Sequence, residues 1–212
     1  MSVTNEMTLY HNLEISYRLL SASLYQPSFE WGDADIFAHL KGALQVVAPA
    51  AAAGAEAMEG VLRAGGETEL TLVYARLFVG PFSLGAPPYG SFYLEPEKKV
   101  MGETTVAVQE FYRQAGLALD EDFTELHDHM AVELEFISYL LRSAVSEAAE
   151  RGEAASTEWV DRRREFLRRF LVGWYGDFCA AIREATDNPF YLAYADCLEA
   201  VVGRDRELLG LK

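Results

Sequence analysis

Apolar residues recur at helical spacing along most of this chain, and this pattern limits the folds that it can adopt. The first stripe has apolar side chains three or four positions apart, at Tyr10, Leu13, Tyr17, Leu20 and Leu24. Comparable stripes predict helices over about residues 5–25, 33–48, 50–63, 68–78, 103–115, 126–150 and 157–185, with a last helix opened by Asn188 and Pro189. No stretch has the two-residue period of a strand. We therefore expect an all-α helical bundle with roughly seven to nine helices.

Length and composition predict one domain over residues 1–212. A chain of 212 residues with 50% apolar residues, 12 Phe and 11 Tyr can form a large core without metals or disulfides. Cys179 and Cys197 both lie in helical apolar patterns, so we expect buried free thiols in a reducing compartment. The N-terminus lacks the features of a secretory signal, and no window of about 18 residues is apolar enough to cross a membrane. These features predict a cytoplasmic protein.

The formal net charge is −15, from 33 acidic and 18 basic residues. Binding to nucleic acid requires a basic face that neutralises phosphates, so this balance argues against DNA or RNA as a partner. The same charge would attract a cationic peptide or protein, although it also serves solubility alone. The acidic balance is therefore compatible with a cationic partner and equally with solubility.

Residues 80–97 interrupt the helical pattern. Prolines and glycines within this segment lead us to expect a loop with no helix. The segment also carries four aromatic residues, Phe82, Tyr89, Phe92 and Tyr93. Such side chains favour packing over disorder, so we expect a functional loop. The helix predicted after it has apolar side chains at Val106, Val108, Phe111 and Tyr112, and Gly116 is expected to end it.

Three ionisable residues, His127, Asp128 and His129, stand near the start of the helix predicted over 126–150. At about 100° per residue, His129 and Glu133 fall on the apolar arc of that helix. A buried carboxylate needs a partner, so we expect His129 and Glu133 to form a structural pair. Asp128 points away from the arc and would act as a first-turn acid favoured by the helix dipole.

The pair His127 and Asp128 resembles the metal ligands of HD-domain phosphohydrolases, which are also all-α. Such a site requires a further His upstream, and His11 and His39 are the available residues, although neither lies in a matching helical context. A ferritin-like di-iron site is excluded because neither His127 nor His129 has Glu three positions before it. An all-α metal-dependent phosphohydrolase using His127 and Asp128 is therefore the alternative hypothesis, with elemental analysis as its test.

Five arginines form a basic cluster within the helix predicted over 157–185, at positions 162–164, 168 and 169. Acidic and apolar residues are interleaved with them. This arrangement is typical of a solvated helix face that carries ion pairs. We therefore assign no binding role to the cluster.

Several motifs together resemble the TorD/DmsD/NarJ family of chaperones for molybdenum redox enzymes. The first is Tyr74-x-Arg-Leu-Phe-x-Gly-Pro81, followed by Ala86-Pro-Pro-Tyr89 with Ser91 and Tyr93. Gly102-Glu103, Phe111-Tyr112 and Gly116 come next. The last motif is Glu125-x-x-Asp128-His129, followed by Glu133-Leu134-x-Phe136. Weaker likeness continues towards the C-terminus, so the resemblance covers nearly the whole chain.

The resemblance implies a cytoplasmic all-α chaperone without catalytic chemistry or a cofactor of its own. Such a protein, a monomer or homodimer, binds the twin-arginine signal peptide of an apo molybdenum oxidoreductase. It holds the precursor until the cofactor is inserted and export can follow. The positions that match the peptide-binding region of the family are Tyr74, Leu77, Phe78, Gly102, Asp128 and His129, and Tyr89, Ser91 and Glu103 are nearby positions that we include in the site.

These residues suit the chemistry of a twin-arginine signal peptide, which has a cationic start and an apolar segment. A receptor for it needs an apolar groove with carboxylates at its rim. We expect Leu77, Phe78 and the aromatic loop to form the groove, with Asp128 and Glu103 at the rim. Packing in the core would also explain the apolar residues Leu77 and Phe78. A structural subunit of a larger redox complex is a further alternative for the function of the protein.

Overall fold

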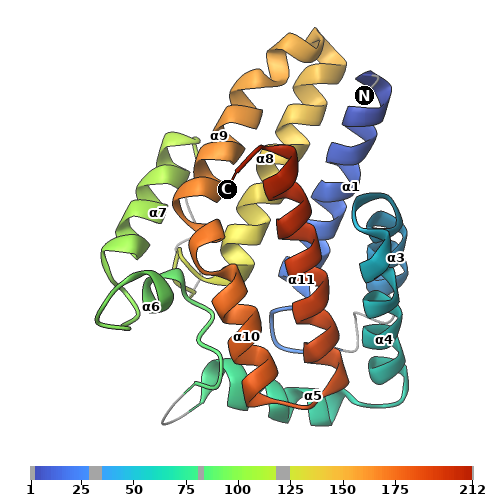
Figure 1. Cartoon of the computed structure of the whole chain (residues 1–212), viewed down its shortest axis with the longest axis vertical. Coiled ribbons are helices and arrows are strands. Elements are labelled where there is room, and N and C mark those ends of the chain that lie inside the picture. The colour runs from blue at the N-terminus through green and yellow to red at the C-terminus, as the bar shows by residue number, and fades with distance from the viewer. Residues whose placement is uncertain (1–2, 29–34, 81–83, 118–124, 212) are drawn as a thin grey trace.

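The computed structural model describes residues 3–28, 35–80, 84–117 and 125–211, and no strand occurs among them. The predicted all-α fold is confirmed (Figure 1). Its α-helices are α1 (Val3–Ala22), α3 (Ile36–Val47), α4 (Ala52–Arg63), α5 (Glu67–Tyr74), α6 (Gly90–Leu94), α7 (Glu103–Gln114), α8 (Met130–Arg151), α9 (Thr157–Arg169), α10 (Tyr175–Ala185) and α11 (Pro189–Leu208). Short 3-10 turns span Pro49–Ala51, Glu153–Ser156 and Leu171–Gly173, and a π-helical turn spans Ala75–Val79.

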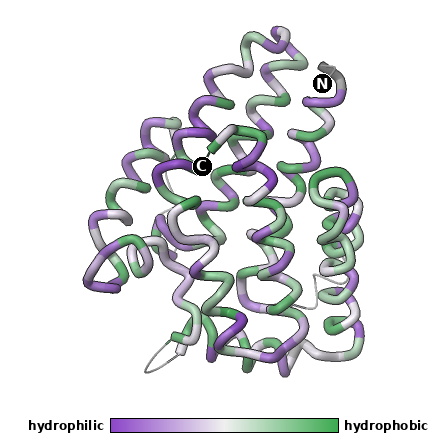
Figure 2. The backbone as a smooth tube through the Cα atoms, in the orientation of Figure 1, coloured by the Kyte–Doolittle hydropathy of each residue, from purple (hydrophilic) through white to green (hydrophobic). Residues whose placement is uncertain are grey.

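The long helices α1, α8 and α11 form the centre of the bundle (Figure 1). Helix α1 packs against α8 and α3, while α11 packs against α4 and α10. Hydrophobic and hydrophilic residues alternate along each helix, as Figure 2 shows, because each helix has one face in the core and one towards solvent. One continuous hydrophobic core results. Helices α6 and α7 lie at one side of this bundle, opposite α3 and α4 (Figure 1).

Several helix ends agree with the sequence. The side chain of Asn188 caps α11 by accepting a hydrogen bond from the Phe190 amide at 3.0 Å. Gly116 has a φ of 80° just after α7, which is the left-handed conformation expected of a glycine that ends a helix. The start of the helix predicted over 33–48 lies outside the described residues. Both cysteines are buried free thiols, as predicted.

Three expected elements differ from the structure. The helix predicted over 157–185 is broken between α9 and α10, which lets Phe170, Leu171 and Trp174 all reach the core. The loop expected over 80–97 contains the short helix α6, so the expectation of no helix there was wrong. The helix predicted from about residue 126 begins at Met130, and this later start moves the residues of interest out of the helix.

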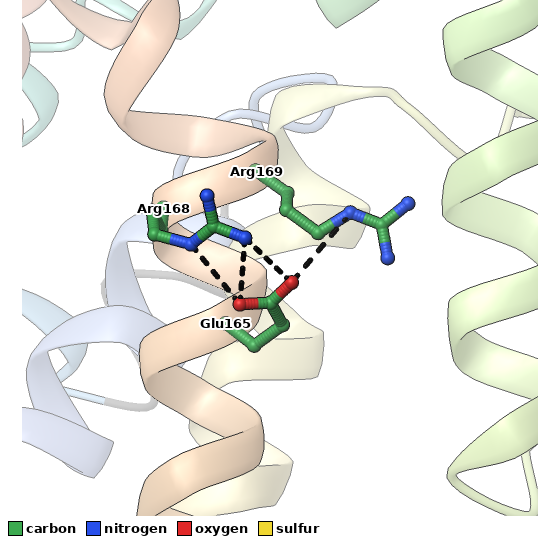
Figure 3. Close-up of polar contacts among 3 residues, drawn as sticks. All are labelled: Glu165, Arg168 and Arg169. Atoms are coloured by element: carbon green, nitrogen blue, oxygen red, sulfur yellow. Dashed lines mark hydrogen bonds and ion pairs between the residues drawn. The ribbon is translucent and has the colours of Figure 1, made fainter.

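Four of the five arginines in the basic cluster on α9 lie on a solvated helix face, as predicted. Figure 3 shows the carboxylate of Glu165 between Arg168, at 2.8 Å, and Arg169, at 3.9 Å. Arg163 differs because it is fully buried, with its guanidinium 3.5 Å from the Asp205 carboxylate and 4.4 Å from the centre of the Tyr10 ring. The expectation of a solvated side chain was therefore wrong for Arg163. Its pairing links α9 to α1 and α11, which the residue pattern of α9 alone does not reveal.

No helix among the described parts of the chain is both long enough and apolar enough to cross a bilayer.

Candidate functional site

A set of hydrogen bonds holds residues 86–91 against the start of α8. The carboxylate of Asp128 accepts a bond from the Ser91 amide at 2.7 Å, and the Asp128 carbonyl accepts one from the Gly90 amide at 2.8 Å. The Met130 amide donates to the Pro88 carbonyl at 2.7 Å. All three bonds bridge segments about forty positions apart in the sequence. We call Ser91, Asp128 and His129 the latch.

His129 is the N-cap of α8. Its Nδ1 accepts a hydrogen bond from the Ala131 amide at 3.2 Å, which satisfies one of the free amides of the first turn. The imidazole stacks on Tyr25 and meets the edge of Tyr89, with ring centres 6.2 and 5.3 Å away. Its Nε2 lies 4.0 Å from a carboxylate oxygen of Glu125. Burial lowers the pKa of His129 to about 4, so the ring is neutral at pH 7.

The expected side-chain pair between His129 and Glu133 does not form. Because α8 begins at Met130, the imidazole of His129 turns back to the first helical amides instead of lying one turn along the helix. Neither carboxylate oxygen of the buried Glu133 has a hydrogen-bond partner. Burial first, and then the charge of Asp128, raise the pKa of Glu133 well above its usual range, while the Trp174 indole acts in the opposite direction. The neutral acid is therefore favoured at this position.

Asp128 does not point away from the core, contrary to the helical projection. Its side chain has no exposed surface. The reason is again the position of α8, since Asp128 precedes the helix, next to the extended His129, and its carboxylate lies towards Ser91. Close approach also requires Gly90, because a Cβ there would lie 3.2 Å from the Trp174 indole nitrogen and 3.4 Å from a Glu133 oxygen.

A second set of contacts fixes the connection between α6 and α7. The carboxylate of Glu95 accepts a hydrogen bond from the Thr104 amide at 2.7 Å, in the first turn of α7. This amide, as the largest cause, lowers the pKa of the half-buried Glu95 carboxyl. A Cβ built on Gly102 would overlap that carboxylate. Within the connection, Lys98 and Met101 have φ values of 49° and 65°, which are uncommon for residues other than glycine.

The connection leaves apolar side chains in solvent. Val100, Met101 and Val106 are 42%, 72% and 64% exposed. Together with Glu97 and Glu103 they line one hollow, and we call these five residues the α7 surface. An adjoining hollow is lined by Leu84, Pro87, Phe92, Lys98, Lys99 and Val100. The α7 surface therefore combines apolar side chains with carboxylates.

The other site residues predicted from the sequence fall into two environments. Leu77 and Phe78 are buried in the core, where Phe78 contacts the rings of Tyr74, Phe178 and Tyr191. Tyr74 and Tyr89 are half-buried. The Tyr89 hydroxyl donates a hydrogen bond to the Glu125 carboxylate at 3.2 Å. The site residues with accessible surface are thus Tyr74, Tyr89, Gly102 and Glu103.

Sequence reasoning missed the exposure of Val106, which it assigned to the buried stripe of the helix over 103–115. Val108, Phe111 and Tyr112 are buried, but Val106 faces solvent. A signal was present, because at 100° per residue Val106 lies about 200° from Val108 around the helix. Val100 and Met101 gave no such signal, since they lie in the connection before the helix.

The described residues contain no group of three or more His, Cys, Asp and Glu side chains arranged to hold a metal ion. Asp128, one of the two proposed ligands, already uses its carboxylate for the Ser91 amide in a buried setting. The ring of His127 lies beside Tyr112, with ring centres 6.3 Å apart. The arrangement of these side chains gives the phosphohydrolase alternative no support.

Known proteins are similar to the part of the chain that contains the latch and the α7 surface. Residues 45–180 match the model of the nitrate reductase delta subunit family, a range that includes the latch and the α7 surface. The chaperone protein TorD of Psychrobacter sp. (strain PRwf-1) is 33% identical over 144 residues, which cover 66% of this chain and 62% of that protein. The Tat proofreading chaperone DmsD of Salmonella paratyphi A is 31% identical over 127 residues, covering 60% of this chain and 55% of that protein. The chain thus spans less than two thirds of these relatives.

A solved structure is similar over most of the chain. It is described as a redox enzyme maturation protein from Archaeoglobus fulgidus, and it matches with a TM-score of 0.53 at 20% identity. The match covers 86% of this chain and 90% of that one. At this identity the likeness concerns the fold alone.

Proposed function

The chain belongs to the nitrate reductase delta subunit family, the family that includes the TorD and DmsD chaperones, and from this membership we propose its function. It is a cytoplasmic chaperone that binds the twin-arginine signal peptide of an apo molybdenum oxidoreductase and holds the precursor until its cofactor is inserted. It performs no catalysis itself. Relatives named TorD and Tat proofreading chaperone DmsD support this proposal.

The proposal is carried by one observation, the hydrogen-bonded position of residues 86–91 beside the start of α8. The latch fixes residues 86–91, and Tyr89 thereby keeps a partly exposed position next to the Glu125 carboxylate. A carboxylate held by a neighbouring hydroxyl is a suitable acceptor for a guanidinium group. The site therefore offers the acidic contact that two adjacent arginines require, in a chain with a net charge of −15.

We propose different roles for the nine predicted site residues. Tyr74, Tyr89, Gly102 and Glu103 have accessible surface and contact the peptide. Leu77 and Phe78 support Tyr74 from the core, and the latch residues Ser91, Asp128 and His129 position the segment that carries Tyr89. The proposal thus keeps every residue of the site and separates contact from positioning.

Titration calorimetry with a synthetic twin-arginine leader tests the function directly. We expect the wild-type protein to bind a leader with Arg-Arg at least tenfold more tightly than the same leader with Gln-Gln. Glu103→Gln should weaken binding of the Arg-Arg leader and leave binding of the Gln-Gln leader unchanged. Equal affinity for both leaders would reject the proposed function.

Two features of the assembly belong to the same proposal. Residues 1–212 form one domain, which the single continuous core of the described helices supports. The protein is a monomer or homodimer, and sedimentation equilibrium distinguishes these states. A larger assembly with mature holoenzyme would favour a structural subunit of a redox complex instead.

A further inference from the structure

The α7 surface exposes apolar side chains to solvent. Among the described residues, six large hydrophobic side chains are exposed, and three of them, Val100, Met101 and Val106, lie together on this surface. Figure 1 shows the connection between α6 and α7 at the edge of the molecule, away from the central helices. Exposed apolar side chains that gather in one hollow and have charged neighbours are typical of an interaction site.

The surface has a defined shape. The Glu95 carboxylate binds the Thr104 amide and so ties the end of α6 to the first turn of α7. Gly102 leaves the space that this carboxylate occupies. The left-handed backbone at Met101 directs the chain through a tight turn just before the helix. The side chains of Val100 and Met101 are therefore presented by a fixed connection. Binding of a ligand to this connection costs less conformational entropy than binding to a flexible connection would.

The charges around the apolar side chains are arranged unevenly. The carboxylates of Glu97 and Glu103 line the same hollow as Met101 and Val106. The adjoining hollow is lined by Lys98 and by apolar residues, and it shares Lys99 and Val100 with the first. The first hollow, which Glu95 also lines, thus has three carboxylates against one lysine, Lys99, while the second has two lysines and no carboxylate. A segment with a cationic end and an apolar middle fits this order, because its cationic end would lie at the carboxylates and away from Lys98.

We propose that the α7 surface docks the apolar segment of the signal peptide, with Met101 and Val106 as the main apolar contacts. Glu97 and Glu103 receive residues at the cationic start of the same peptide, in addition to the Glu125 carboxylate beside Tyr89. This inference rests on the proposed function and adds Glu97, Val100, Met101 and Val106 to its site. The occupant is the peptide, whose cationic and apolar parts match both halves of the surface, whereas a second copy of this acidic chain would place like charges together.

The test compares the variant Met101→Ser/Val106→Ser with the wild type in titration calorimetry against the Arg-Arg leader. Val46→Ser is the matched control, because Val46 is 47% exposed but lies on α3, on the opposite side of the bundle. We expect the double variant to bind at least tenfold more weakly and the control to bind like the wild type. Urea unfolding of all three proteins shows whether each variant is folded.

The outcomes separate this inference from the proposed function. Equal binding by the wild type, the double variant and the control would reject the α7 surface and leave the chaperone function standing. Absence of leader binding by the wild type would overturn both. If the double variant instead changes the sedimentation of the free protein, the surface is an interface between copies of this chain, and the inference fails. If the double variant unfolds, Met101→Ala is measured in its place, with the same requirement of weaker binding.

Discussion

In the sequence the residues of the α7 surface lie between Ser91 and Asp128 of the latch, yet the two regions have opposite environments. Asp128 and His129 are buried, and Asp128 Oδ2 and His129 Nδ1 each accept a hydrogen bond from a backbone amide. Met101 and Val106 are more than half exposed. Both regions lie within the matched range of the family model. In the account proposed above, this difference separates motif residues that position the site, Asp128 and His129, from Met101 and Val106, which no motif includes and which contact the peptide.

Titration of His129 should give the largest change in unfolding free energy that we expect for a latch residue. Its pKa is lowered from 6.5 to about 4 by burial, so the unfolded chain takes up a proton at a higher pH than the folded protein does. Stability from this residue is therefore fully present above pH 6.5 and is lost as the pH falls towards 4. The difference corresponds to roughly 3 kcal/mol of unfolding free energy.

Urea unfolding at a series of pH values checks this prediction. His129→Gln should have a shallower loss of stability than the wild type between pH 6.5 and 4. His127→Gln is the control, because the pKa of His127 is also lowered but its side chain is only partly buried. The same slope in wild type and His129→Gln would contradict a buried neutral imidazole.

Removing the Asp128 carboxylate should lower the unfolding free energy by slightly less than the titration of His129 does. Asp128→Ala leaves the Ser91 amide without its buried acceptor, and we expect a loss of about 2–3 kcal/mol of unfolding free energy. Asp128→Asn retains an oxygen at this place and should lose less. A change in peptide affinity without a change in stability for Asp128→Ala would mean that Asp128 contacts the peptide, and the contrast between the two regions would fail.

A smaller change in unfolding free energy is expected at Gly102, in the connection between α6 and α7. Gly102→Ala forces the Glu95 carboxylate away from the Thr104 amide, which removes a cap of α7 and should lower the unfolding free energy by about 1 kcal/mol. Gly42→Ala on α3 is the control, since a Cβ there meets no atom within 4 Å. The control should be neutral or stabilising. Equal stability of both variants in urea would show that Glu95 does not hold the connection.

The smallest effect on stability is expected at the α7 surface itself. Met101→Ser changes a side chain that is 72% exposed, so its unfolding free energy should stay within about 0.5 kcal/mol of the wild type. Thermal and urea unfolding check this value. A loss as large as that of Asp128→Ala would mean that Met101 is part of the core, and the two regions would no longer differ.

The sequence predicts the helical fold because periodicity reports burial within each helix. It places α3, α4, α7 and α11 close to their observed bounds. It fails at residues 170–174, where the chain breaks a helix so that Phe170, Leu171 and Trp174 can all be buried. Local spacing carries no information on that requirement, because it depends on the helices that pack from other parts of the chain.

The site is less predictable than the fold, for a related reason. The roles of Asp128 and His129 depend on where α8 begins, and a shift of four residues turned an expected exposed acid into a buried hydrogen-bond acceptor. Arg163 shows the same dependence, since its partner Asp205 lies on α11. Hydrogen bonds between distant segments decide these positions, whereas helical spacing describes neighbours along one element only.

Hydrogen exchange of the wild-type protein, with and without a saturating Arg-Arg leader peptide, tests the separation of the two regions most directly. We predict that the peptide slows exchange of amides in residues 97–107, at the α7 surface. The Ser91 amide, already bound by Asp128, should exchange equally slowly in both states. New protection at Ser91 and His129, with no change over residues 97–107, would contradict a latch that positions and a surface that binds.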